Sequence, residues 1–489
     1  MKKSGLKFNV ILSLISQFVC YISPLIVAPY ISRVLGPDGI GVYSFSYSFV
    51  FYFSSLIVLG FSNLGITMIS KERDDKEKYS IIFWTTLLLR FFLGIVLIGI
   101  YLGLSFCGVL GGQDNIYIML ALTLVLIGNI VDIKFLFQGL ENFKIITYIQ
   151  VLTYVLYIGS IFLLVKNRND VLLYTILKSS TDLLVNIVLF VFAVKYIKRP
   201  CIDFKIMPNL LKNSLLLFVP SILINLGIQL EQTFLGVFSN NTEVGYFQQA
   251  IKFPLLIGNL TYAICPVMMA RVSYLIKEGK NDEIKDKISK ILLLAALLSL
   301  PCCLGLYSIG EIFVPLYFGQ EFLPVVNIFY ITLPISIFSP INAILINAYL
   351  YPLKKTNYVV IAAGCELIVN IILSIILLYG FNLGAIGGAT ACFICEVILF
   401  LLLLIFCRNS FHHKFVIRDF LKIIISALLI ACAVIPFNRF VQLNIWLQLF
   451  IDVIIGAFIY GIVLIVTKEF VVLNILNYCI SKFIRKEIN

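Results

Sequence analysis

Long apolar stretches alternate with short polar ones along the whole chain of 489 residues. Apolar runs of eighteen or more residues are typical of helices that cross a membrane, where about 30 Å of hydrocarbon must be spanned. Fourteen such runs can be counted, with soft boundaries. They lie at about 8–32, 40–70, 80–104, 114–137, 146–166, 171–196, 212–236, 244–276, 287–310, 322–350, 356–379, 382–406, 419–437 and 444–466. The pattern predicts an all-α polytopic membrane protein with about fourteen transmembrane helices.

One segment departs from the helical pattern. Residues 43–49 read Y-S-F-S-Y-S-F, an alternation of aromatic and small polar side chains with the period of a β-strand. The segment lies inside an apolar run of about thirty residues, and an open strand edge cannot be tolerated in lipid. We therefore predict a helix here, whose small serines allow a neighbouring helix to approach closely.

Composition and charge agree with a membrane protein. Hydrophobic residues make up 61% of the chain and charged residues 13%, which excludes an ordinary soluble domain. Thirty of the 37 Lys and Arg residues fall in one alternate set of loops, including both termini. The positive-inside rule places that set, and both termini, in the cytoplasm. The net charge of +12 thus reports topology, and no nucleic-acid partner is expected because no soluble basic domain exists.

The second part of the chain repeats the first. The segment that starts at Gly41 is echoed by the segment that starts at Gly245, 204 residues later, and a charged loop follows each. Six spans per copy give two parallel lobes, at 1–200 and 201–410, with two extra helices and a cytoplasmic tail at 411–489. Two parallel lobes around a central cleft are typical of transporters that work by alternating access.

The polar segment 35–41, L-G-P-D-G-I-G, is predicted to be the outer turn between the first two spans. Pro and Gly supply the special backbone angles of such a turn. Arg33, just before it, is expected to extend its charged end to the membrane surface. The segment is either a plain turn with an anchoring arginine or the outer gate of the cleft.

Ionisable groups inside the spans are costly and are candidates for function. Lys178, Asp182 and Asn186 lie at i, i+4 and i+8 on the sixth span and form one polar stripe, in which the lysine and the aspartate can pair. Arg90 and Lys252 have no partner within their own helices, which favours the cleft. Structural pairing and a transport role both remain open for the stripe.

Carboxylates outnumber basic groups at membrane depth. Glu366 starts a second polar stripe on the eleventh span and can pair with Glu396 on the twelfth, whereas Asp132 closes the fourth span one turn after Asn129. The twelve cysteines are scattered without any metal-binding spacing, so no cofactor or metal is expected.

Three phrases of the sequence resemble one family. They are YISRVLGPDGIGVYSF at 30–45, FSNLGITMISKER at 61–73 and FLFQGLENFK at 135–144. Together with the span count they are similar to the Wzx-type oligosaccharide flippases of the multidrug/oligosaccharidyl-lipid/polysaccharide exporter superfamily. The resemblance covers the whole chain and is not specific to a particular sugar.

The resemblance implies a flippase that moves undecaprenyl-diphosphate-linked oligosaccharide repeat units across the bacterial inner membrane for O-antigen, capsule or exopolysaccharide. A polysaccharide polymerase and a chain-length regulator are implied partners, beside membrane lipids. By position, the candidates for the diphosphate are Arg33, Arg90, Lys178 and Lys252, and those for the sugar are Tyr43, Tyr47 and Asn129. Asp182, Glu366, Glu396 and Asp132 are candidates for ion coupling or structural pairing.

Three alternatives stay open at this point. A cation-coupled drug exporter of the superfamily normally has twelve spans and a carboxylate in its first span, which is absent from 8–32 here. A lipid II flippase shares the fourteen spans. A membrane enzyme such as a glycan polymerase needs a large outer loop or paired outer carboxylates, whereas Asp38 stands alone in the first outer turn.

Overall fold

The computed structural model describes residues 6–111, 115–200, 202–262, 265–408, 411, 413–441 and 444–467. These residues form helices and no strand, and twelve helices among them are long and apolar enough to cross a membrane. The first of the twelve, Ile15–Lys71, covers both of the first two expected spans. The predicted fold class is confirmed, whereas the C-terminal tail after 467 lies outside the described residues.

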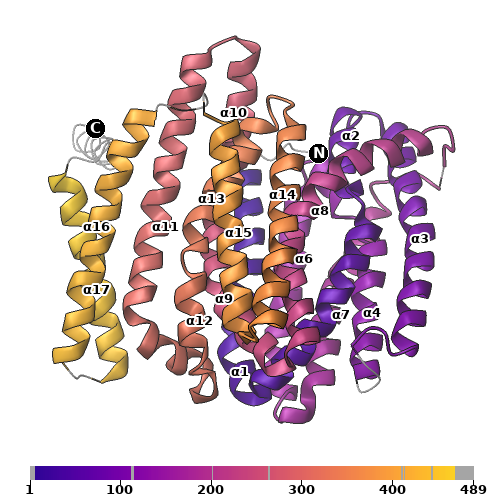
Figure 1. The fold of residues 1–489 in the computed structure, drawn as a ribbon. Helices are drawn as coiled ribbons and strands as arrows, with labels where there is room; N and C mark the ends of the chain where they lie inside the picture. The colour runs from indigo at the N-terminus through magenta and orange to yellow at the C-terminus, as the bar shows by residue number, and fades with distance from the viewer. Residues whose placement is uncertain are drawn as a thin grey trace, which may run out of the picture. The chain divides into compact units, whose positions relative to one another are not determined.

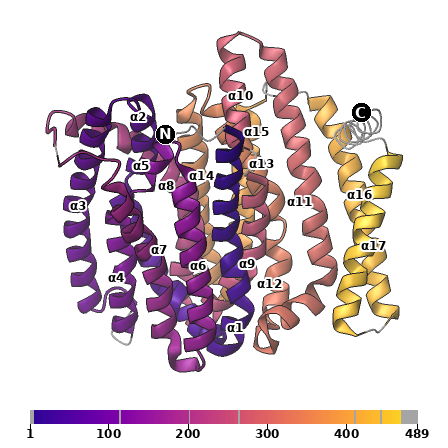
Figure 2. The ribbon, with the colours of Figure 1, turned by 180° about the vertical axis from the view of Figure 1, so that it is seen from behind.

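The chain divides into two compact units. Figures 1 and 2 show its helices from opposite sides. Unit 1 contains residues 1–248 and 378–384, and unit 2 contains the rest. The elements of unit 1 are α1 (Leu6–Val58), α2 (Phe61–Lys71), α3 (Lys76–Phe106), α4 (Ile116–Ile130), α5 (Lys134–Gly139), α6 (Phe143–Leu164), η2 (Arg168–Asp170), α7 (Val171–Ala193), α8 (Met207–Phe238) and the start of α9 (Asn241–Tyr262).

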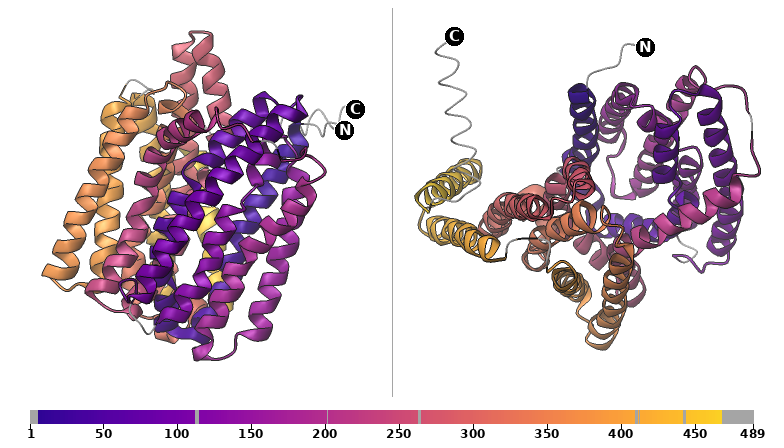
Figure 3. Two further views of the ribbon diagram at one scale, coloured as in Figure 1. Left: turned by 90° about the vertical axis from the view of Figure 1, so that its right-hand side faces the viewer. Right: turned by 90° about the horizontal axis from the view of Figure 1, so that it is seen from above.

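Unit 2 continues α9 with a run of helices interrupted by short turns. Its elements are α10 (Cys265–Lys277), α11 (Asn281–Phe318), η3 (Gln320–Phe322), α12 (Val325–Thr332), α13 (Ile335–Ile344), η4 (Leu345–Leu350), α14 (Thr356–Ser374), η5 (Ile375–Gly380), α15 (Gly384–Phe406), α16 (His413–Phe440) and α17 (Ile445–Val466). The end of η5 and the first residue of α15 lie in the segment 378–384 that belongs to unit 1. The two last helices lie side by side (Figure 3), and Tyr460 of α17 donates a hydrogen bond to the carbonyl of Leu297 on α11 (2.8 Å).

Two helix ends in unit 1 coincide with residues that are suited to begin or end a helix. Asp75 caps α3 by accepting hydrogen bonds from the backbone N–H groups of Glu77 (3.0 Å) and Lys78 (3.2 Å). These bonds, chiefly the one from Lys78, lower the pKa of the Asp75 carboxyl. Gly60, with φ of 74°, separates α1 from α2. The left-handed angle suits a residue without a side chain.

The predicted turn at 35–41 is a sharp bend inside α1. Gly36 has φ of 68° and ψ of 180°, so the helix stops there and starts again at Pro37. Proline is favoured at the first position of a helix because its missing N–H would have no partner there. The strand-like segment 43–49 is helical, as predicted, with Ser44, Ser46 and Ser48 buried.

The serines give α8 close access to α1. The hydroxyls of Ser48 and Tyr52 lie 2.8 Å and 2.7 Å from the hydroxyl of Thr233 on α8. The ring of Phe45 lies where a side chain at Gly236 would stand, since an added Cβ atom would be 2.1 Å from its nearest ring atom. Helix α8 therefore packs against α1 through small residues and shared hydroxyl groups.

Replacing Thr233 by valine tests this contact. Valine keeps the shape but removes the hydroxyl that meets both Ser48 and Tyr52, so we expect the free energy of unfolding to fall by about 1–2 kcal/mol. The melting temperature of the purified protein in detergent would report the loss. Thr390→Val is the matched control, because the exposed Thr390 hydroxyl bonds within its own helix, to the Ile386 carbonyl. Equal melting temperatures would contradict the prediction.

The backbone contacts are tighter still where the two repeated segments meet. A Cβ atom on Gly41 would lie 1.6 Å from the carbonyl oxygen of Asn241, and one on Gly245 would lie 2.0 Å from that of Pro37. The two glycines begin the two similar segments. Gly41 lies against the backbone of Asn241, four residues before Gly245, and Gly245 lies against the backbone of Pro37, four residues before Gly41. We call these four residues the glycine seam.

Candidate functional site

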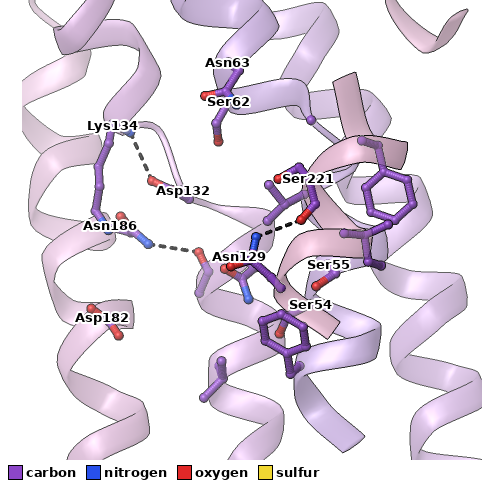
Figure 4. A pocket seen from close by; sticks show the side chains of 18 of the residues that line it. Ser54, Ser55, Ser62, Asn63, Asn129, Asp132, Lys134, Asp182, Asn186 and Ser221 are labelled. Carbon is purple, nitrogen blue, oxygen red and sulfur yellow. Dashed lines mark hydrogen bonds between the residues drawn. The ribbon is translucent and has the colours of Figure 1, made fainter. Parts of the chain in front are cut away.

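A polar cavity of about 400 Å³ lies entirely within unit 1 (Figure 4). This volume is within the range of small-ligand sites. Six helices line it, namely α1, α2, α4, α5, α7 and α8. Its lining residues are Tyr47, Phe51, Ser54, Ser55, Val58, Gly60, Ser62, Asn63, Val125, Gly128, Asn129, Asp132, Lys134, Asp182, Asn186, Phe218, Ser221, Ile222 and Asn225.

A break in the fourth predicted span forms one wall. Helix α4 ends at Ile130 and α5 starts at Lys134. The regular helical pattern of backbone hydrogen bonds is therefore interrupted over the three residues between them. The carboxylate of Asp132 accepts a hydrogen bond from the backbone N–H of Lys134 (3.1 Å). Irregular backbone at membrane depth is tolerated where it lines a cavity or is covered by protein. Both conditions hold here.

Arg90 on α3 covers the back of this break. One end of its guanidinium donates to the carbonyl oxygen of Asp132 (2.6 Å), and the other donates to the hydroxyl of Ser62 (2.7 Å). The guanidinium also lies over the rings of Phe135 (5.2 Å) and Phe61 (5.9 Å). Arg90 is fully buried and is absent from the cavity lining, so it holds two lining residues in place from behind.

The polar stripe of the sixth predicted span lines the cavity from α7, on the same side as α5 (Figure 4). Asp182 accepts a hydrogen bond from the Tyr154 hydroxyl (3.2 Å), and the Asn186 amide donates to the Gly128 carbonyl on α4 (3.0 Å). Both line the cavity. Lys178 lies instead over the ring of Tyr157 (5.1 Å), and the structure records no ion pair between it and Asp182.

Aromatic rings complete the lining. Tyr47 and Phe51 of α1 and Phe218 of α8 face the cavity. Tyr43 is not part of the lining but stacks on Tyr47, with ring centroids 5.9 Å apart, and meets Tyr174 edge to face at 5.0 Å. Hydroxyl, amide and carboxylate groups beside apolar rings suit a ligand with many hydroxyl groups and some apolar faces.

The cavity thus brings together five of the residues singled out in the sequence: Tyr47, Asn129, Asp132, Asp182 and Asn186. Arg33 is exposed beside the bend in α1, where its side chain donates to the Pro29 carbonyl (3.4 Å). Lys252 belongs to the part of α9 in unit 2. Neither lines the cavity.

The two glutamates lie in unit 2. Glu396 on α15 accepts a hydrogen bond from the side-chain amide of Asn342 on α13 (2.8 Å). One carboxylate oxygen of the buried Glu366 on α14 has no hydrogen-bond partner among the described residues. The hydrogen bond that Glu396 accepts therefore comes from an amide on α13, and not from Glu366 on α14.

Sequence reasoning missed Lys134, which lines the cavity although the charge pattern assigns it to the cytoplasmic loops. Nothing in the run V-D-I-K at 131–134 marks a helix break, because it contains neither Gly nor Pro. An aspartate two residues before a lysine at the end of a span was the available signal.

The sequence profile of the family described as "Polysaccharide biosynthesis protein" matches residues 6–270. A protein of Escherichia coli (strain K12) named as a candidate O-antigen transporter is 27% identical over 422 residues, which is 83% of this chain and 98% of that protein. A protein of Haloferax volcanii named as a flippase of low-salt glycan biosynthesis is 22% identical over 236 residues, covering 46% of this chain and 47% of that protein.

Solved structures share the fold. A lipid II flippase, MurJ, in an inward closed conformation has a TM-score of 0.74 and 18% identity, covering 93% of this chain and 97% of that one. An inward-facing multidrug transporter of the MATE family has a TM-score of 0.65 and 15% identity, covering 79% and 93%. Since the family profile matches more than half of the sequence, this chain is a member of the polysaccharide biosynthesis protein family and has the fold of the flippases and transporters to which it is similar.

Proposed function

We propose that this protein moves an undecaprenyl-diphosphate-linked oligosaccharide repeat unit from the cytoplasmic to the outer face of the bacterial inner membrane by alternating access. The observation that carries the proposal is the polar cavity of unit 1, which offers hydrogen-bonding groups to a hydroxyl-rich ligand within membrane-spanning helices. The family and its O-antigen and glycan relatives support a lipid-linked glycan as the cargo. Both termini lie in the cytoplasm in this proposal.

Each candidate residue has a role in this scheme. Tyr47 and Asn129 contact the sugar, with Tyr43 supporting the ring of Tyr47. Arg33, Lys178 and Lys252 are candidates for the diphosphate, whereas Arg90 acts through the groups that it holds. The carboxylates Asp132, Asp182, Glu366 and Glu396 serve ion coupling or structural pairing. A polymerase and a chain-length regulator would take the repeat unit on the outer face.

Deleting the gene in the native host tests the function. We expect undecaprenyl-diphosphate-linked repeat units to accumulate on the cytoplasmic side while surface polysaccharide is lost, because a diphosphate and several sugars cannot cross hydrocarbon unaided. Lipid-linked glycans extracted from intact and permeabilised cells would be quantified, and a plasmid copy of the gene should restore the surface polymer. Unchanged glycans would contradict the proposal, and full-length units unpolymerised outside would indicate an enzyme instead.

A drug exporter is the second candidate. It is favoured by the two carboxylates against one ammonium in the cavity lining, which would suit a cationic drug, and by the fold shared with the multidrug transporter. The same deletion separates the two functions. Increased sensitivity to cationic drugs with normal surface glycan would replace the flippase by the exporter.

A further inference from the structure

The charge of the cavity in unit 1 restricts the ligand that it can take. The lining contains the carboxylates of Asp132 and Asp182 and the single ammonium of Lys134, so its formal charge is −1. Arg90 is buried behind Ser62 and the Asp132 carbonyl, so it offsets part of the Asp132 charge but cannot contact a ligand in the cavity. The charged groups that a ligand can contact directly are therefore two carboxylates and one ammonium, which disfavour an anion.

A diphosphate or a carboxylated sugar would be repelled here. Proteins bind such groups with several cationic side chains or converging N–H groups, which form charge-assisted hydrogen bonds. Two carboxylates in a partly desolvated cavity oppose a further negative charge, and the opposition grows as the local dielectric constant falls. One lysine does not offset both.

Uncharged hydroxyl groups, by contrast, meet partners on every side. Figure 4 shows the polar groups of α5 and α7 on one side, those of α1 and α8 on the other, and Asn129 between them. The Ser54 hydroxyl and the Asn186 amide oxygen are buried and have no hydrogen-bond partner in the part of the chain that the structure describes. Buried polar atoms are normally paired, so these two atoms beside the cavity would gain a hydrogen bond if a small side-chain movement admitted a water or a ligand hydroxyl.

The charged groups lie on the side of α5 and α7, whereas the aromatic rings belong to α1 and α8 on the other side. Carboxylates and amide oxygens accept hydrogen bonds from sugar hydroxyls, and the Lys134 ammonium donates to a hydroxyl or carbonyl oxygen. The rings of Tyr47, Phe51 and Phe218 provide surface for the apolar face of a pyranose. An amino group on the sugar would gain further from the two carboxylates.

We propose that this cavity is a glycan subsite that accepts a neutral or amine-bearing sugar residue and discriminates against an acidic one. The inference rests on the proposed function and deepens it, since it concerns the sugar of the lipid-linked unit. The lipid diphosphate lies outside this cavity. Asp182 is assigned as the main source of the discrimination. Each carboxylate accepts one hydrogen bond, Asp182 from the Tyr154 hydroxyl and Asp132 from the Lys134 N–H, but Asp132 also lies beside the buried guanidinium of Arg90, which offsets its charge.

Binding of three synthetic lipids to the purified full chain in lipid nanodiscs tests the subsite. The probes are undecaprenyl diphosphate alone, the same lipid carrying N-acetylglucosamine, and the same lipid carrying glucuronic acid. We expect the neutral sugar to bind about tenfold more tightly than the lipid alone, which is about 1.4 kcal/mol. The acidic sugar should bind no better than the lipid alone. This comparison needs no variant.

Asp182→Asn then tests the source of the selectivity. We expect affinity for the acidic probe to rise about tenfold while that for the neutral probe changes less than about threefold, because an amide removes the charge and keeps the shape. Asp282→Asn is the matched control, since the Asp282 side chain is 93% exposed in the first turn of α11 in unit 2. It should change neither affinity.

The outcomes separate the two proposals. If none of the three lipids binds, the proposed function fails. If all three bind equally, or the acidic probe binds most tightly, the subsite inference fails while the flippase function stands. If the wild-type protein prefers the neutral probe but Asp182→Asn leaves that preference intact, the assignment of the selectivity to Asp182 is wrong.

Discussion

Replacing Gly41 by alanine should destabilise this protein strongly, because the added methyl group has no room. The new Cβ atom would lie 1.6 Å from the carbonyl oxygen and 2.4 Å from the carbonyl carbon of Asn241. Both are backbone atoms, which cannot rotate away as a side chain can. The bend in α1 and the start of α9 would have to separate, and we expect the free energy of unfolding to fall by about 3 kcal/mol.

The matched control is Gly99→Ala in α3, where an added Cβ atom meets nothing within 4 Å. Alanine is a better helix former than glycine, so this variant should be neutral or more stable by up to about 1 kcal/mol. Melting temperatures of the purified proteins and surface polysaccharide in the complemented deletion strain would be compared. If Gly41→Ala behaves like Gly99→Ala in both assays, the glycine seam is not a close contact.

A double variant sharpens the test. Gly245→Ala should have a similar effect, because its Cβ atom would lie 2.0 Å from the Pro37 carbonyl oxygen. One separation of the two segments relieves both clashes, so the double variant should cost less than the sum of the single ones. Additive costs would mean that the two contacts yield independently.

Replacing Arg90 by methionine has the second large expected effect. The change leaves the Asp132 carbonyl and the Ser62 hydroxyl without their donor. A buried group that loses its partner costs about 1–3 kcal/mol, and these two half-buried groups lie toward the lower end of that range. Part of this cost is offset because a desolvated charge is removed and methionine still packs on the rings of Phe61 and Phe135. We expect a net loss of about 2–3 kcal/mol in the free energy of unfolding.

A conservative variant separates charge from geometry. Arg90→Lys keeps the positive charge but cannot donate in the fork that reaches both Asp132 and Ser62, so it should recover only part of the stability. Arg73→Met is the control, since that arginine is partly exposed and forms a surface ion pair with Glu141, worth less than about 1 kcal/mol. Full recovery by lysine in melting temperature and in surface polysaccharide would show that only the charge matters.

Hydropathy was sufficient to predict thirteen of the fourteen expected spans, because a helix that crosses lipid must show its length and its apolar composition in the sequence. The eighth expected span, 244–276, is not among the twelve membrane-length helices that the described residues contain. The strand-like segment 43–49 could also be interpreted, since lipid excludes an open strand edge. Gly36 and Pro37 carried the signal of the bend in α1. In each of these cases the structural constraint acts on residues that are neighbours in the chain, so the pattern can be recognised in a single sequence.

The cavity was only partly predictable. Asn129, Asp132 and Asp182 attract attention as polar groups at membrane depth, but the break that exposes them is stabilised by Arg90 from another helix. Lys134 follows that break, so a count of loop charges includes it with the cytoplasmic lysines. Contacts between distant segments leave no local pattern, and the same is true of Asn342, whose amide meets Glu396.

The glycine seam links the evolution of the two similar segments that start at Gly41 and Gly245. Gly41 packs closely against the backbone of Asn241 in the second segment, and Gly245 packs closely against that of Pro37 in the first. A larger residue in either copy can be accommodated only if the backbone of the other copy shifts at the matching position. Substitutions at these two positions are therefore expected to be coupled, although 204 residues separate them in the sequence.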